Sequence, residues 1–233
     1  MKRVLETDDM GEEEIMIAYD NLKTLDLVND YFLNRALELC PAGKILDVGC
    51  GTGRMLKNVQ GDYEKYGLDI SERLIDQARQ QDSNLGYKVG NSNSLPYDSK
   101  SFDLVMCHSV LHHLEDPKKT IEEIVRVAKP KGAIFVRDLI RPASEEVLQR
   151  LFLGYLAGHY GEQNKRLFEN SLRSSFTNDE WKGYFSEGIS ISNVLFYNVA
   201  ERFASGDKVD LQERKLREVD FVLSRLTEPI TYQ

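Results

Sequence analysis

The spacing of hydrophobic residues changes along the chain. Residues 12–39 carry apolar positions at helical spacing, and Pro41 and Gly43 end that region. From there to Leu139, short apolar runs alternate with amphipathic stretches. The runs typical of strands are 44–48, 65–68, 87–89, 102–107 and 132–139. The stretches typical of helices are 52–59, 71–81 and 116–128, with Ser71 as a cap and Pro117 at a first position. This alternation predicts a mostly parallel sheet with helices on both faces.

The alternation stops after residue 139. Residues 141–176 keep a helical period without a clear strand, and Thr177 is a typical cap for a helix to about residue 187. Residues 189–197 and 200–204 are predicted to pair as closing antiparallel strands. The charged, periodic segment 207–226 is predicted to form an amphipathic helix.

These elements predict one domain over residues 1–233. We expect a Rossmann-like α/β fold with a mostly parallel seven-stranded sheet, preceded by an N-terminal helical cap at 12–40. Residues 141–176 are too few for a core of their own, so we interpret them as a helical lid insertion on the main domain.

A glycine-rich loop follows the first predicted strand, and it carries the clearest chemical signal. The run reads Ile45-Leu46-Asp47-Val48-Gly49-Cys50-Gly51-Thr52-Gly53-Arg54. Glycine permits positive φ and leaves the backbone bare, and the following helix offers unpaired N–H groups to a ligand. A turn without a ligand and a dinucleotide site are the alternatives. The dinucleotide pattern needs a small residue where Arg54 stands, which disfavours a dehydrogenase.

The same run resembles the first motif of the class I S-adenosylmethionine-dependent methyltransferases, and the likeness extends over about residues 40 to 140. The resemblance implies that the loop from Gly49 to Gly53, with Cys50 and Gly51, lies beneath the methionine and ribose parts of the cofactor S-adenosylmethionine. It also implies that Asp47 helps to position the cofactor's amino end.

Further cofactor contacts are expected at the ends of the next two strands. Asp69 is placed to accept both ribose hydroxyls, or else to cap the helix that follows. Ile70 would then pack on the adenine. Asn91 and Ser92 follow the third strand, where the family reads the adenine; an ordinary turn asparagine is the alternative. Tyr19 resembles an aromatic residue that closes over the cofactor, although a core position is an equal alternative.

The methyl-facing loop follows the fourth predicted strand. His108 begins this loop and is the candidate general base, since histidine titrates near neutrality; a hydrogen-bonding loop residue is the alternative. His112 and His113 are interpreted as shaping the loop. They lack helical spacing and a third ligand, so no metal site is expected.

Candidate acceptor-binding residues lie beyond the fifth strand. Arg137 and Arg141 are suited to bind an anionic group as planar forks, with ion pairing inside the protein as the alternative. Tyr155 and Tyr160 lie in the predicted lid and are either substrate contacts or packing residues.

Composition narrows the class of partner. The chain has 30 basic and 38 acidic residues, a formal net charge of −8, which makes nucleic acid a poor partner. No segment resembles a membrane span or a signal peptide, and three scattered cysteines indicate reduced thiols, so a cytoplasmic monomer or homodimer is expected. The sequence therefore predicts a methyltransferase acting on a small-molecule acceptor. A protein-modifying methyltransferase and a non-catalytic S-adenosylmethionine-binding protein remain as alternatives.

Overall fold

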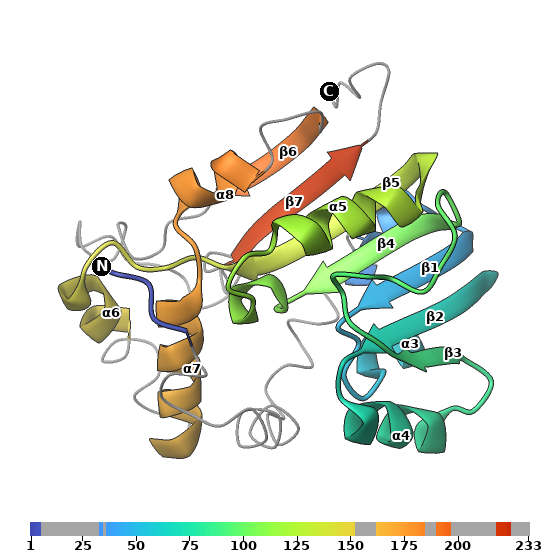
Figure 1. Cartoon of the computed structure of the whole chain (residues 1–233), viewed down its shortest axis with the longest axis horizontal. Coiled ribbons are helices and arrows are strands. Elements are labelled where there is room, and N and C mark those ends of the chain that lie inside the picture. The colour runs from blue at the N-terminus through green and yellow to red at the C-terminus, as the bar shows by residue number, and fades with distance from the viewer. Residues whose placement is uncertain (6–32, 35, 152–161, 185–189, 197–217, 225–233) are drawn as a thin grey trace.

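The structure is a computed structural model that describes residues 1–5, 33–34, 36–151, 162–184, 190–196 and 218–224. Its centre is one twisted sheet with the strand order β3-β2-β1-β4-β5-β7-β6 (Figure 1). The strands are β1 (Gly43–Val48), β2 (Tyr63–Asp69), β3 (Gly86–Val89), β4 (Phe102–His108), β5 (Ala128–Leu139), β6 (Ser190–Phe196) and β7 (Glu218–Ser224). Strands β1 to β5 run parallel, and β7 pairs antiparallel with both β5 and β6. The sheet is therefore mostly parallel, as predicted, with a five-stranded parallel part.

Helices lie between the parallel strands. Two helices of the structure begin at a cap that the sequence predicts, whereas Pro117 precedes the first residue of its helix and does not occupy that position. The helices are α3 (Arg54–Asn58), α4 (Glu72–Gln81), the 3-10 turn η3 (Leu111–His113), α5 (Lys118–Val127), α6 (Glu145–Leu151), α7 (Glu162–Ser174) and α8 (Asn178–Tyr184). Ser71 Oγ accepts a hydrogen bond from the N–H of Leu74 at the start of α4. Thr177 and Glu180 cap the start of α8 reciprocally, each side chain accepting from the backbone N–H of the other. Both predicted caps are confirmed.

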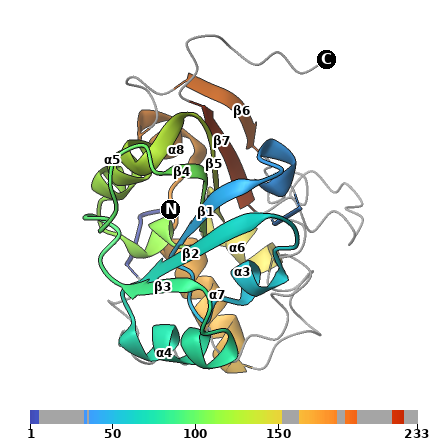
Figure 2. The same cartoon turned by 90° about the vertical axis from the view of Figure 1, so that its right-hand side faces the viewer.

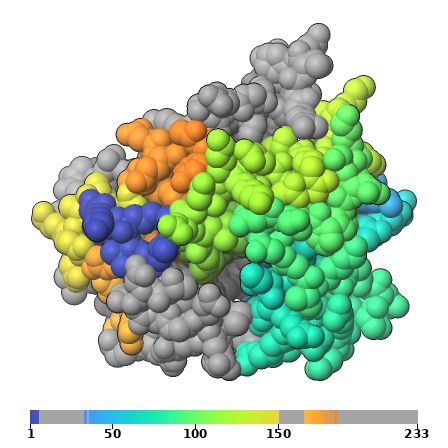
Figure 3. Space-filling model, viewed as in Figure 1, coloured from blue at the N-terminus to red at the C-terminus, as the bar shows by residue number. Residues whose placement is uncertain are grey.

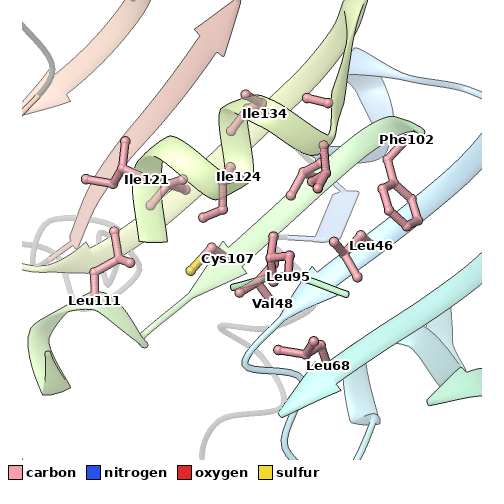
Figure 4. Close-up of a cluster of buried hydrophobic side chains, with 14 of the residues drawn as sticks. Leu46, Val48, Leu68, Leu95, Phe102, Cys107, Leu111, Ile121, Ile124 and Ile134 are labelled. Carbon is pink, nitrogen blue, oxygen red and sulfur yellow. The ribbon is translucent and has the colours of Figure 1, made fainter. Parts of the chain in front are cut away.

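Alternating residues of the strands build a hydrophobic core on each face of the sheet. On β4, Val105 and Cys107 join the cluster under α5, whereas Leu104 and Met106 join the cluster with α3 and α4. Figure 4 shows the first cluster between α5 and the sheet, and Figure 2 shows α5 and α4 at a distance from each other. Each fully buried aliphatic side chain contributes roughly 1.5–3 kcal/mol. Two buried faces explain why these strands are apolar throughout.

The last described strand differs from the prediction. Residues 218–224 form β7 between β5 and β6, so the expected helix over 207–226 is wrong there. Val219, Phe221 and Leu223 alternate with polar Glu218 and Asp220, which is a strand period that the surrounding charges obscured. The predicted strand at 189–197 is confirmed as β6, and its predicted partner 200–204 lies outside the described residues.

The two predicted helical additions are described in part. Residues 33, 34 and 36–39 are helical, with Leu33 and Ala36 buried against the core, and the rest of the N-terminal cap up to residue 32 lies outside the described residues. Within 141–176, α6 and α7 confirm the helical period. Strand order reverses between β1 and β4, which is where open α/β sheets bind ligands at the carboxyl ends of their strands.

Candidate cofactor and active site

The glycine loop after β1 has three residues with positive φ: Gly49 at 77°, Gly51 at 52° and Gly53 at 74°. A Cβ atom on Gly49 would lie 2.2 Å from Val110 Cγ2, and one on Gly53 would lie 2.1 Å from the Tyr87 hydroxyl. A Cβ atom on Gly51 would meet nothing within 4 Å. Gly49 and Gly53 therefore serve close internal packing, whereas the backbone at Gly51 is left bare for a ligand.

Asp47 is fully buried beside this loop, at the end of β1. Among the residues that the structure describes, neither of its carboxylate oxygens has a hydrogen-bond partner. Burial, with a further contribution from the charge of Asp69, raises its pKa to about 7. Since buried polar groups are almost always paired, this carboxylate is suited to receive a donor from a bound molecule or water.

Asp69 lies at the end of β2 and joins two parts of the site. Its Oδ2 accepts a hydrogen bond from the N–H of Gly51 at 2.8 Å, and its Oδ1 accepts one from the N–H of Ser71 at 2.9 Å. A carboxylate offers about four acceptor positions, so two remain for ligand hydroxyls. Next to it, Ile70 is 70% exposed, which is unusual for a large aliphatic residue and suits a flat apolar ligand surface.

The loop after β3 is ordered by its own side chains. Asn91 Oδ1 accepts a hydrogen bond from the N–H of Asn93 at 2.8 Å, which is the geometry of a turn asparagine. The Ser92 hydroxyl lies 2.9 Å from Thr120 Oγ1 in α5. Asn91 therefore has its amide nitrogen available for a ligand in addition to its turn role. Cys50, in the glycine loop, is buried against Gly67.

These features fit S-adenosylmethionine. The two buried carboxylate oxygens of Asp47, which lack a partner among the described residues, match an ammonium donor. The bare backbone at Gly51 leaves room for the cofactor to approach closely, and Asp69 offers further acceptor positions. Exposed Ile70 offers an apolar surface at the end of the same strand.

The sequence suggested that His108, at the end of β4, titrates near neutrality, but its surroundings in the structure lower its pKa. Burial and the positive charge of Arg137 lower its pKa to about 3. The imidazole is therefore neutral at physiological pH and suits hydrogen bonding better than proton removal. Arg137 lies opposite it in the β4–β5 register and is also buried.

A buried His112–Asp138 pair that the sequence did not single out joins the turn after β4 to the end of β5. His112 Nδ1 is 2.5 Å from Asp138 Oδ1, and both side chains are inaccessible to solvent. Asp138 Oδ2 also accepts from the N–H groups of Leu111 at 2.8 Å and His112 at 3.3 Å. Burial alone would raise the Asp138 pKa, but the adjacent His112 lowers it below the ordinary value. In the sequence, the only sign of this pair was that His112 stands next to a second histidine, His113.

Of the residues predicted to bind the acceptor, some are described by the structure and others are not. Arg141 is almost fully buried: its Nη2 bonds both carboxylate oxygens of Glu180, at 2.7 and 2.9 Å, and its Nη1 bonds the Ser175 carbonyl. This internal ion pair is the alternative that the sequence left open. Tyr19, Tyr155 and Tyr160 lie outside the described residues.

Within the described part of the chain, no group of three His, Cys, Asp or Glu side chains is arranged to hold a metal ion. In the same part, none of the helices has the length and apolar character needed to cross a bilayer.

Comparison with known proteins shows which family model and which relatives the region around this site resembles. Residues 46–136 match the family model described as "Methyltransferase domain". A ubiquinone biosynthesis O-methyltransferase from Coxiella burnetii is 33% identical over 128 residues, 52% of this chain and 54% of that protein. A demethylmenaquinone methyltransferase from Thermotoga maritima is 29% identical over 123 residues, 52% of this chain and 53% of that protein. The chain thus spans about half the length of these curated relatives.

Solved structures extend the likeness in fold to nearly the whole chain. The plantazolicin methyltransferase BamL, solved with a triazolic desmethylPZN analogue and SAH, has a TM-score of 0.71 at 16% identity and covers 95% of this chain and 93% of its own. A putative methyltransferase in complex with the Haloferax volcanii Trm112 activator has a TM-score of 0.63 at 20% identity, with 93% of this chain and 99% of its own covered. Residues 46–136 are therefore similar to a methyltransferase domain, and the fold of the chain is similar to that of solved methyltransferases.

Proposed function

We propose that this protein is a methyltransferase that transfers a methyl group from S-adenosylmethionine to a small-molecule acceptor. The observation that carries the proposal is the buried, unpartnered Asp47 carboxylate beside the bare backbone of Gly51. The names of the Coxiella and Thermotoga relatives, a ubiquinone biosynthesis O-methyltransferase and a demethylmenaquinone methyltransferase, support a small acceptor.

Each candidate residue has a proposed role in holding the cofactor. Asp47 receives the amino end, Asp69 accepts from the ribose hydroxyls, and Ile70 packs against the adenine. Asn91 and Ser92 lie at the adenine edge, and Gly49, Cys50, Gly51 and Gly53 form the floor. Tyr19 is proposed as a residue that closes over the cofactor.

S-adenosylmethionine supplies a methyl group on a positively charged sulfur, which is a good leaving group. The protein's part is therefore to align the acceptor and exclude water. We propose that His108, neutral because its pKa is about 3, orients the acceptor as a hydrogen-bonding group at the methyl side. Arg137, Tyr155, Tyr160 and the helical segment 141–176 are proposed to shape the acceptor pocket.

Calorimetry tests the cofactor assignment. The protein is titrated separately with S-adenosylmethionine, S-adenosylhomocysteine and NAD. We expect binding of the first two at micromolar or lower dissociation constants and no heat with NAD. Binding of NAD alone would contradict the proposal.

A panel of small acceptors, including hydroquinones, catechols and carboxylic acids, then tests methyl transfer by the appearance of S-adenosylhomocysteine. Cofactor binding without turnover on any small acceptor, but with turnover on protein substrates, would favour a protein-modifying enzyme.

The three cysteines, all free in the structure, support a reducing compartment, and we propose that the protein is located in the cytoplasm.

A further inference from the structure

The N-terminal residues 1–5 lie across the loop that follows β4, far from it in sequence. Figure 3 shows them on the surface between α6, α7, α8 and the segment after β4. The N–H of Val4 donates to the carbonyl of Arg173, near the end of α7, at 3.2 Å. This segment, residues 1–5, is called the N-terminal strap below.

Arg3 is the residue through which the strap contacts the loop. Its Nη2 donates to the carbonyls of His112 at 3.3 Å and Leu114 at 2.6 Å, and its Nη1 donates to that of Glu115 at 2.9 Å. Its Nε donates to the carbonyl of Ser174 in α7 at 2.5 Å. One guanidinium group therefore satisfies carbonyls from two elements, which a planar fork of five donors does better than any other side chain.

An aromatic ring supports the guanidinium from one side. The Arg3 Cζ atom lies 3.8 Å from the centre of the Phe176 ring, which is the distance of a cation–π contact. Phe176 itself packs on Trp181, with ring centroids 4.8 Å apart, inside the core. The position of Arg3 is therefore fixed by the core as well as by its hydrogen bonds.

The other side of the same loop is held by the sheet. Asp138, at the end of β5, bonds the N–H groups of Leu111 and His112 and the His112 ring. At the start of the loop, Val110 packs so closely on Gly49 that a Cβ there would lie 2.2 Å away. The loop after β4 is thus bound by the strap on one side and by β5 on another. Through Val110 it also contacts the glycine loop.

We propose that Arg3 is a positioning residue that holds the loop 109–115 in the shape required for cofactor binding and methyl transfer. The proposal rests on the proposed function, because it assigns to Arg3 a role in that same site. Since coupling between two sites is reciprocal, a bound cofactor must in turn protect the strap and the loop.

The test compares Arg3→Ala with Lys2→Ala, its exposed neighbour, which removes the same charge. Amide hydrogen exchange of peptides covering 109–116 is measured for the wild type and for each variant, without ligand and with S-adenosylhomocysteine. We expect Arg3→Ala to exchange at least tenfold faster in this loop and to bind S-adenosylhomocysteine at least tenfold more weakly. Lys2→Ala should match the wild type in both.

Arg3→Lys separates geometry from charge. One ammonium cannot reach all four carbonyls, so we expect loop exchange between those of the wild type and Arg3→Ala, and this variant also serves if Arg3→Ala does not fold. Loop exchange in Arg3→Ala and Arg3→Lys equal to that of the wild type would overturn the proposal. If the wild type does not bind S-adenosylhomocysteine, the proposed function fails, while the exchange without ligand still decides whether Arg3 holds the loop.

Discussion

The Nδ1 atom of His112 lies 2.5 Å from the Oδ1 atom of Asp138, and neither side chain is exposed. The pair joins the loop after β4 to the end of β5, and the Asp138 carboxylate also accepts three backbone N–H groups, from Leu111, His112 and Leu139. One carboxylate thus satisfies donors that would otherwise be buried without partners.

We predict that Asp138→Ala is strongly destabilising. The substitution removes the carboxylate that the buried imidazole and three backbone donors contact, a loss of about 3–5 kcal/mol in the free energy of unfolding. Denaturant unfolding measures it. Asp76→Ala is the matched control, because Asp76 forms an exposed pair with Arg79, and it should change the free energy by less than about 1 kcal/mol. Equal losses in both variants would contradict the structural role of Asp138.

The same carboxylate has a predictable acid dependence. Its pKa is lower in the folded protein than in the unfolded chain, so the folded protein holds that proton more weakly. The stabilisation is therefore complete above the unfolded value of about 4 and is lost as the pH falls further. Unfolding measured from pH 6 down to pH 3 should show a steeper loss for the wild type than for Asp138→Ala.

The contribution of Asp47 to stability should depend on pH in the opposite direction to that of Asp138. Its pKa of about 7 in the folded protein exceeds the unfolded value of about 4, so the contribution of Asp47 to stability is most favourable below pH 4 and declines as the pH rises between these values. Asp47→Asn keeps the shape and removes the charge. We expect this variant to lose the decline between pH 4.5 and 7, which denaturant unfolding at several pH values measures. An unchanged decline in the variant would show that another group causes it.

Cofactor affinity should respond to the same proton. If Asp47 receives the ammonium group of S-adenosylhomocysteine, the carboxylate must be ionised, and affinity should rise from pH 5.5 to 7.5, by up to about tenfold per pH unit at the acid end. Calorimetry checks this. Asp47→Asn should bind more weakly at pH 7.5 and show a flatter profile, and a profile as steep as that of the wild type would exclude the contact.

Two glycines of the glycine loop after β1 should have different effects on stability and on ligand binding when each is replaced by alanine. Gly51→Ala meets no atom within 4 Å, so we expect only the strain of a positive φ, about 1–2 kcal/mol, together with a loss of S-adenosylhomocysteine binding of at least tenfold. Gly53→Ala brings a Cβ within 2.1 Å of the Tyr87 hydroxyl and should lower stability by several kcal/mol. Thermal unfolding and calorimetry on both variants distinguish the two effects, and a Gly51→Ala protein with normal affinity would move the ligand away from this loop.

Asp69→Ala should weaken the binding of S-adenosylhomocysteine at least tenfold, because two charge-assisted bonds to the ribose would be lost. Asp69 also bonds the N–H groups of Gly51 and Ser71, so Asp69→Asn, which keeps an acceptor for one of them, is the companion variant. Calorimetry measures the affinity of both variants for S-adenosylhomocysteine. Unchanged affinity in both would show that Asp69 does not bind the ribose.

The sequence predicted what depends on local pattern. The glycine run gave the loop after β1, alternating apolar runs gave the parallel strands, and Ser71 and Thr177 gave two helix starts. Contacts between distant segments were not predictable in this way. The His112–Asp138 pair spans 26 residues and the Arg3–Ser174 contact spans 171, and no periodicity records such pairings.

Two further differences have local causes. The His108 pKa depends on how deeply the ring is buried and on Arg137 across the sheet, and neither is visible in a single strand. Strand β7 was hidden because charged residues on both sides of Phe221 and Val222 extend a helical pattern over a segment that alternates with a period of two.

The position of β7 has a consequence for biosynthesis. Strand β5 is completed at Leu139, but its outer neighbour β7 begins only at Glu218, about 80 residues later in synthesis. Until then, every second residue of β5 between Ala133 and Leu139 presents its N–H and C=O groups at an open sheet edge. Such an edge is a template for pairing with other nascent chains. A ribosome-bound fragment ending near residue 200 should therefore aggregate or retain chaperones, whereas a chain that includes β7 covers this sheet edge.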